Sequence, residues 1–180
     1  MATEAENHIM DRIKDALDSS QNIQVEEFLD LLLGTDKIFI YGVGRSGSVA
    51  RAFSIRLVQL GLKVYFIGET TTPIVEPDDL VIIVSNTGET MSAIQTANIV
   101  RRVGAKVVAI TAKNHSKLAH AASMIIHLNI KKEEKDSEFA PLGTIFEATA
   151  LIFLDGVVAQ LIRKMGTSEA QMRARHSIWV

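Results

Sequence analysis

The sequence predicts an α/β fold in which a five-stranded parallel sheet of order 2-1-3-4-5 is flanked by helices on both faces. Short apolar runs alternate along the chain with segments of helical periodicity, which is typical of parallel sheets covered on both sides. Turns rich in glycine or hydroxyl residues follow the first and third predicted strands but not the second. In this strand order the first and third strands are neighbours, and the switch point lies between them. Both turns are therefore expected to open onto one crevice.

The N-terminal part, residues 1–34, is predicted to be helical. Ile9, Ile13, Ala16 and Leu17 recur at helical spacing and indicate an amphipathic helix over about residues 3–18. A second helix is predicted from Val25 to Leu33 and ends at Gly34.

Residues 37–128 form the predicted α/β core. Its strands are expected at Lys37–Tyr41, Lys63–Ile67, Leu80–Ser85, Lys106–Ile110 and Met124–Leu128. Its helices are expected at Ser48–Leu60, Met91–Val103 and Ser116–Ala121, with Gly61 and Gly104 closing the first two. Right-handed crossovers are expected throughout.

The C-terminal part, residues 144–176, is again predicted to be helical. Before it, Lys131 to Glu138 is a charge run without an apolar face, which indicates a solvated loop ended by Pro141-Leu142-Gly143. Thr144 to Met165 is apolar nearly all round and is expected to be buried in the core or against another subunit. A homo-oligomer is therefore expected. A last short helix, capped within Thr167–Glu169, precedes Arg173, Arg175 and His176.

Composition narrows the class of protein. The 180 residues fit a single domain spanning 1–180, and a net charge of −2 offers no electrostatic case for nucleic acid or an anionic membrane. Cysteine is absent, which excludes disulfides, thiolate metal sites and a cysteine nucleophile. The polar, acidic start is unlike a signal peptide, and no apolar run approaches the length of a membrane span. A cytoplasmic protein that binds neither nucleic acid nor membrane is expected.

The stretch Ser85-Asn86-Thr87-Gly88-Glu89-Thr90 joins a buried strand to a helix. Unpaired N–H groups and the positive end of the helix dipole favour an anion there, and the hydroxyls add donors. Gly88 allows a positive φ or a close ligand approach. We interpret this loop as a binding site for the terminal phosphate of a small sugar. The alternative is that Thr87 or Thr90 is an ordinary helix N-cap.

A second glycine motif, Gly42-x-Gly44-x-x-Gly47, follows the first strand and also matches the dinucleotide fingerprint. Glu69, at the end of the second strand, lies where a ribose-binding acid would be, although it can equally be a plain loop carboxylate. A dehydrogenase needs further chain for its substrate, and the hydroxyl-rich loop has no role in that fingerprint. Dinucleotide binding is therefore the weaker interpretation.

The motifs at 42–47, 68–73, 85–90 and 141–147 together resemble a sugar isomerase (SIS) domain, which has a flavodoxin-like sheet. Their order, spacing and the short chain resemble the 6-phospho-3-hexuloisomerases within that superfamily, over about residues 37–176. The related arabinose 5-phosphate isomerases usually carry CBS domains, for which this chain has no room.

The resemblance implies conversion of D-arabino-3-hexulose 6-phosphate to fructose 6-phosphate in the ribulose monophosphate pathway of formaldehyde assimilation. It also implies a homotetramer built as a dimer of dimers, and Glu147 as the catalytic base. The residues implied to contact phosphate are Ser46, Ser85, Thr87 and Thr90, with Gly44, Asn86 and Gly88 shaping the loops. Family members usually have serine where Thr87 stands; the hydroxyl is kept.

The implied reaction moves a carbonyl from C3 to C2 through a cis-enediol, which needs one carboxylate and no metal or redox cofactor. Partial burial raises the pKa of a carboxylate and suits it to this work. Glu147 stands near the start of an apolar helix. The alternative is a capping box, Thr144-x-x-Glu147, with no catalytic role.

A developing enediolate also needs a hydrogen-bond donor or a cation. The candidates are Arg45 and His176; Arg45 could pair with phosphate or with Glu69, and the sequence does not choose. His176 would have to come from a folded-back tail or a neighbouring subunit, and it can equally be a solvated residue of a mobile terminus. A sugar-phosphate sensor would need the phosphate loops but not Glu147. No helix pair for DNA binding is evident in the short N-terminal region and the chain is not basic, which favours the enzyme over the sensor.

Overall fold

The computed structural model describes residues 1–20 and 24–178. Its strands form one parallel sheet of order β2-β1-β3-β4-β5, as predicted. In register, Ile40 of β1 stands beside Phe66 of β2 on one side and Ile82 of β3 on the other. The strands are β1 (Ile38–Gly42), β2 (Val64–Phe66), β3 (Leu80–Val84), β4 (Lys106–Thr111) and β5 (Met124–His127).

The helices lie close to their predicted positions. The helices α2, α4 and α7 have the predicted bounds, and α1 begins after Thr3, whose side chain caps it. The helices are α1 (Glu4–Ser19), α2 (Val25–Leu33), α3 (Gly44–Leu60), α4 (Met91–Val103), α5 (Lys117–Ala121), α6 (Asp136–Phe139), α7 (Thr144–Met165) and α8 (Glu169–Ala174).

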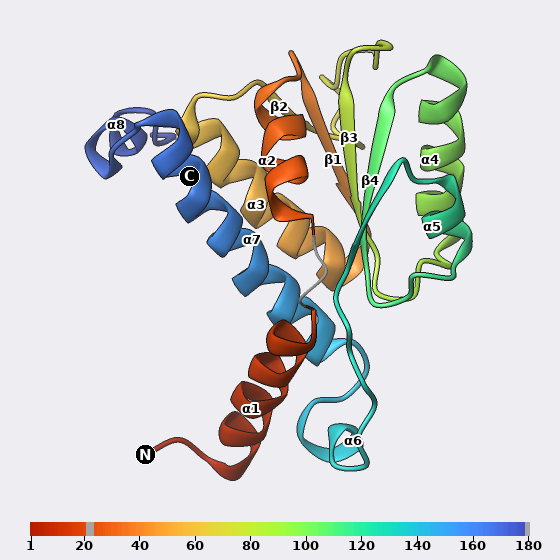
Figure 1. The fold of residues 1–180 in the computed structure, drawn as a ribbon, viewed down its shortest axis with the longest axis vertical. Helices are drawn as coiled ribbons and strands as arrows, with labels where there is room; N and C mark the ends of the chain where they lie inside the picture. The colour runs from red at the N-terminus through yellow and green to blue at the C-terminus, as the bar shows by residue number, and fades with distance from the viewer. Residues whose placement is uncertain (21–23, 179–180) are drawn as a thin grey trace.

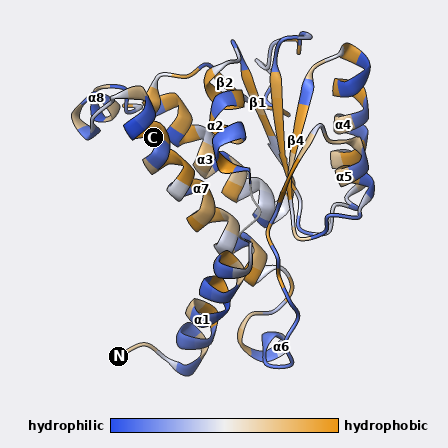
Figure 2. Cartoon of the chain, viewed as in Figure 1, coloured by the Kyte–Doolittle hydropathy of each residue, from blue (hydrophilic) through white to orange (hydrophobic). Residues whose placement is uncertain are grey.

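The sheet is the middle layer of three. Figure 1 shows α2, α3 and α7 on one face of the sheet and α4 with α5 on the other, while α1 extends away from the body beside the start of α7. Colouring by hydropathy shows apolar strands between helices of mixed character (Figure 2). Every residue of β3 is buried, as expected of a central parallel strand covered on both faces.

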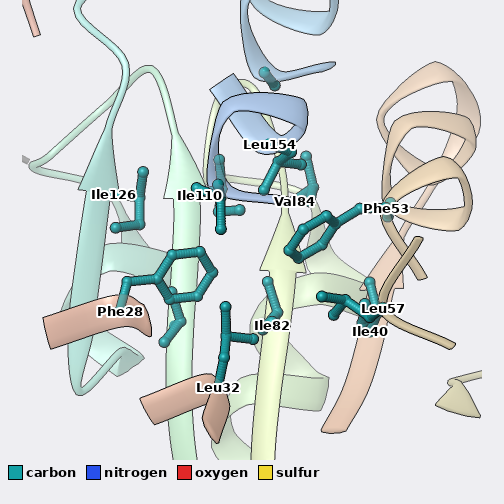
Figure 3. Packing of buried hydrophobic residues seen from close by; sticks show 14 of the residues in the cluster. Phe28, Leu32, Ile40, Phe53, Leu57, Ile82, Val84, Ile110, Ile126 and Leu154 are labelled. Atoms are coloured by element: carbon teal, nitrogen blue, oxygen red, sulfur yellow. The ribbon is translucent and has the colours of Figure 1, made fainter. Parts of the chain in front are cut away.

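The larger core lies between the sheet and the α2, α3 and α7 layer. Phe28 and Leu32 of α2, Phe53 of α3 and Leu154 of α7 point toward Ile82 and its neighbours (Figure 3). Each of these side chains is at most 2% exposed, and burial of such a side chain stabilises a fold by about 1.5–3 kcal/mol. This core fixes the positions of α3 and α7 relative to the sheet.

The helix α3 begins at Gly44, earlier than the predicted Ser48. A Cβ on Gly47 would stand 2.6 Å from the carbonyl oxygen of Gly42, so glycine lets the first turn of α3 lie directly against the end of β1. The glycine motif is therefore a strand end and a helix start rather than an open loop. Ser46 consequently lies in the first helical turn and is buried.

The charge run is solvated at most positions but not throughout, which corrects the prediction of a plain loop. Asp136 starts the short helix α6 and is only 14% exposed. Its Oδ1 accepts hydrogen bonds from His8 Nε2 at 2.9 Å and Arg12 Nε at 3.0 Å. This ionic contact joins α1 to the segment before α7.

By length and composition α7 could cross a membrane, contrary to the expectation that no segment reaches that length. Its contacts with α1, α2 and α3 and its position in the core explain this apolar character. One side of α7 faces away from the core and leaves Leu151 and Ile152 exposed by 38% and 48%.

Candidate active site

Two helix N-termini meet at the carboxyl edge of the sheet. The helix α3 follows β1 directly and α4 follows the loop after β3, and these strands are hydrogen-bonded neighbours. A cavity of about 130 Å³ lies between the two helix starts, which confirms the predicted common crevice. It is lined by Val43, Ser46, Val84, Ser85, Asn86, Thr87, Thr90 and Ala93.

The cavity favours an anion although its lining contains no charged side chain. The first N–H groups of α3 and α4 have no intrahelical partner, and both helix dipoles are positive at this end. A different cavity, of about 550 Å³, borders the opposite edge of the sheet; the charged residues of its lining are Glu27, Asp30, Asp78 and Asp79 with one lysine, Lys106. Its acidic lining disfavours a phosphate.

The hydroxyls of the loop have different roles. Thr90 is the N-cap of α4, but its side chain makes no capping hydrogen bond, and its Oγ1 lies 3.4 Å from the buried Ser85 Oγ. Thr87 Oγ1 accepts a hydrogen bond from the Glu89 N–H at 3.2 Å and lies in an exposed residue. The capping alternative therefore does not explain the hydroxyl of Thr90, which faces the cavity with Ser85.

Gly88 has φ +63°, as expected for this turn. A Cβ at this position would stand 2.1 Å from Ser116 Oγ, so the absent side chain makes room for the start of α5 rather than for a ligand. Gly44, with φ +58°, has open space around it. Both glycines therefore shape the loops, at positions where other residues would be strained.

Glu147 lies in the first turn of α7 with its side chain only 12% exposed. The N-cap of this helix is Gly143, and Thr144 is already the first helical residue, whose Oγ1 donates to the Pro141 carbonyl at 2.8 Å. Thr144 and Glu147 are therefore not a capping box. The carboxylate is instead oriented toward the neighbouring helix α3.

Arg45 provides that orientation, since its Nε donates a hydrogen bond to Glu147 Oε2. Glu69, the other partner left open by the sequence, pairs with Arg51 at 2.6 Å. Because Arg45 directly precedes the cavity residue Ser46, the ion pair places the carboxylate beside the anion cavity.

Two further residues converge on Glu147. A Cβ on Gly143 would stand 3.0 Å from Glu147 Oε1 and 3.1 Å from Asn86 Nδ2, so both polar atoms face the open side of this glycine. In the sequence, Gly143 belongs to the turn before α7 and to the motif at 141–147, with no role of its own indicated. That motif and the one at 85–90 share the family resemblance, but no periodicity or spacing indicates that Gly143 lies beside Asn86.

His176 lies away from this group in its own chain. It follows α8, and Figure 1 shows α8 at the opposite end of α7 from α6. At a rise of 1.5 Å per residue, the stretch of α7 between Glu147 and its end at Met165 is about 27 Å long. The Nη1 of Arg175 lies 3.4 Å from the carbonyls of Gln59 and Leu60, which holds this segment against the end of α3. A folded-back tail therefore does not bring His176 to Glu147.

One group of residues in the described part of the chain has the spacing of metal ligands, namely His8, Glu133 and Asp136. Arg12 already pairs with both carboxylates, at 3.0 Å each. We therefore interpret the group as an ion-pair cluster.

Comparison with known proteins gives consistent results. The model of the SIS domain matches residues 31–155. A 3-hexulose-6-phosphate isomerase of Methanocaldococcus jannaschii is 40% identical over 153 residues, which cover 85% of this chain and 82% of that protein. The protein of the same name from Bacillus subtilis is 32% identical, with 97% of both chains covered.

Among solved structures, the protein MJ1247 from Methanococcus jannaschii superimposes with a TM-score of 0.88 and 35% identity, over 99% of this chain and 100% of that one. That structure was described as inferring a function of 3-hexulose-6-phosphate isomerase.

Proposed function

This chain belongs to the SIS domain family of sugar-phosphate isomerases, and on that premise we propose that it interconverts D-arabino-3-hexulose 6-phosphate and fructose 6-phosphate. The observation that carries the proposal is the position of Glu147. Its largely buried carboxylate stands beside an anion cavity with no charged side chain in its lining and is oriented by Arg45. A phosphorylated sugar held by its phosphate would therefore present its carbon chain to a fixed carboxylate.

The cavity between α3 and α4 takes the phosphate. Ser46, Ser85 and Thr90 supply hydroxyl donors, and the first N–H groups of the two helices supply the rest. Thr87 contributes at the exposed rim, where its hydroxyl is shared with Glu89. Gly44, Asn86 and Gly88 belong to the same two turns.

Glu147 acts as the base. It removes the proton from C2, and the electrons of the broken C–H bond form the C2–C3 double bond of a cis-enediolate. The same carboxyl group returns the proton to C3 while the carbonyl forms at C2. Arg45 keeps the carboxylate in place, and because the two residues lie on different helices, their relative position depends on the core between α3 and α7.

We propose that the protein is a homotetramer built from dimers. The outward side of α7 exposes Leu151 and Ile152, and α3 beside it exposes Ile55 and Val58. A second copy of the chain would cover such apolar side chains. In such an assembly His176 of one subunit reaches the site of another, which its own chain does not allow.

We also propose that the whole chain 1–180 acts as one SIS domain in the cytoplasm, in the ribulose monophosphate pathway. The second candidate is an arabinose 5-phosphate isomerase, which uses the same phosphate cavity and base. A non-catalytic sensor is less favoured, because binding a sugar phosphate does not require a carboxylate oriented by Arg45 beside the cavity.

The test is turnover of D-arabino-3-hexulose 6-phosphate by the wild type and by Glu147→Gln. Glutamine keeps the size of the side chain but cannot act as a base, so we expect kcat to fall by about 10²–10⁴. Glu69→Gln is the matched control, since Glu69 also pairs with an arginine of α3 but is 53% exposed and lines neither of the two cavities that Asn86 borders. It should keep near wild-type activity. A wild type that is inactive on this sugar, but active on arabinose 5-phosphate, would favour the second candidate.

The role of His176 is tested by mixing subunits. Glu147→Gln and His176→Asn should each be inactive alone, and exchanged mixtures of the two should regain part of the activity. No regain in mixtures shown to have exchanged subunits would refute a shared site.

A further inference from the structure

Asn86 stands between two cavities. It lines the 130 Å³ anion cavity and also a neighbouring cavity of about 390 Å³, which is bordered by Gly143 and Lys113. The residue is half-buried at this junction.

The main chain of Asn86 is held independently of its side chain. Its carbonyl accepts hydrogen bonds from Thr111 Oγ1 and from the Ala112 N–H, both at 3.1 Å. The loop conformation therefore does not depend on the side-chain amide. Over residues 1–20 and 24–178, the structure records no hydrogen bond to that amide.

The free amide faces the base. Asn86 Nδ2 and Glu147 Oε1 both lie within 3.1 Å of the point where a Cβ on Gly143 would stand. A donor and a carboxylate that converge on one open space are the arrangement required for proton abstraction beside a carbonyl. The side-chain amide of Asn86 is only half-buried and has no partner to give up among the described residues, so it is available to a ligand that enters this space.

The proposed reaction needs such a donor. Negative charge develops on the C3 oxygen as the C2 proton leaves, and a positioned hydrogen bond to that oxygen lowers the barrier. Arg45 is committed to the other carboxylate oxygen of Glu147. An amide is neutral and has no accessible pKa, so it donates without competing for the proton that the base carries.

We infer that Asn86 is a catalytic residue, whose Nδ2 donates a hydrogen bond to the C3 oxygen of the substrate; this rests on the proposed function. Glu147 takes the C2 proton, the C–H electron pair becomes the C2–C3 double bond, and the carbonyl electrons move to the C3 oxygen. The O2 proton passes to the adjacent O3, the carbonyl forms at C2, and Glu147 returns its proton to C3. Atoms and charge balance without another reactant.

The experiment compares Asn86→Ala and Asn86→Asp with the wild type. Alanine removes the donor, and aspartate replaces it with an acceptor of equal size that repels the enediolate. Because the hydroxyls of Ser46, Ser85 and Thr90 and the helix N–H groups are proposed to hold the phosphate, we expect kcat to fall by about 10²–10³ in both variants, with KM changed only a few-fold in Asn86→Ala. Asn98→Ala, an exposed asparagine on α4, is the matched control and should keep full activity.

A second readout separates catalysis from loop structure. A four-carbon phosphorylated aldonohydroxamate mimics the enediolate, because its planar unit places a carbonyl group at C3, a nitrogen at C2 and a hydroxyl at O2. Inorganic phosphate, in contrast, probes only the anion cavity. In Asn86→Ala the hydroxamate should bind at least 30-fold more weakly (on the order of one lost charge-assisted hydrogen bond), with phosphate binding unchanged.

The outcomes distinguish the two proposals. If the wild type converts the hexulose phosphate and Asn86→Ala keeps kcat within about threefold, Asn86 is not catalytic. The same conclusion follows if the variant loses affinity for hydroxamate and phosphate equally. If the wild type does not convert the sugar at all, the proposed function fails, and this inference fails with it.

Discussion

Gly143→Ala tests the geometry of the site with little disturbance of the fold. Gly143 has φ −105° and ψ 12°, a conformation open to any residue. An added methyl group would stand 3.0 Å from Glu147 Oε1, 3.1 Å from Asn86 Nδ2 and 3.4 Å from Glu147 Cδ. The substitution therefore places a methyl group between the proposed base and the proposed donor.

The two expected effects differ in size. Loss of glycine at a helix N-cap costs about 0.5–1 kcal/mol, and the lower entropy of the unfolded chain returns about 0.4–1 kcal/mol. The free energy of unfolding should therefore change by less than about 1 kcal/mol. The carboxylate and the amide must move apart by several tenths of an ångström, and since a 1 Å misplacement costs about 10²-fold, we expect kcat to fall by about 10- to 100-fold.

The assay combines thermal unfolding with steady-state turnover of the hexulose phosphate. Gly156→Ala is the matched control, because Gly156 lies on the same helix with no atom within 4 Å of its added Cβ. It should stabilise the helix by about 1 kcal/mol and leave kcat unchanged. A Gly143→Ala enzyme with wild-type kcat would refute the convergence of Glu147 and Asn86 on this space.

Three further predictions concern the phosphate, the ion-pair cluster and the assembly. Ser85→Ala and Thr90→Val should each weaken inorganic phosphate binding by about 2- to 10-fold, the value of one neutral hydrogen bond, measured by calorimetry; unchanged binding in both would place the phosphate elsewhere. Burial would raise the pKa of Asp136, but hydrogen bonds from Arg12, the Glu133 N–H and His8 outweigh it and lower the pKa from 3.8 to about 2. Because the pKa of Asp136 is lower in the folded protein than in the unfolded chain, its carboxylate stabilises the fold by up to about 2 kcal/mol above pH 4, and this contribution is lost as the pH falls through about 2. Asp136→Asn should therefore abolish that part of the pH dependence of the free energy of unfolding. An unchanged pH profile in the variant would contradict this account. Ile152→Lys would bury a charge in the proposed interface between subunits. It should therefore lower the oligomer mass measured by light scattering, while the circular dichroism spectrum stays native. An unchanged mass would exclude this side of α7 from the interface.

The sequence by itself determined the sheet order and the common crevice. The alternation of apolar strands with helices, and the position of special turns after only two strands, are local patterns that depend on few neighbours. The helix bounds of α2, α4 and α7 followed from glycines and apolar periodicity in the same way. The start of α3 did not, because only the contact between Gly47 and Gly42 shows that the helix begins against the strand.

The tertiary structure decided what each candidate side chain does. Arg45 could pair with several groups in sequence terms, and only the packing of α3 against α7 brings it to Glu147 rather than Glu69. A capping box at Thr144 was a sound local pattern, but the turn places the N-cap one residue earlier, at Gly143. The convergence of Asn86, Gly143 and Glu147 joins residues about sixty positions apart in the chain, and no local pattern encodes such a contact because its distances depend on the whole core between the sheet and α7.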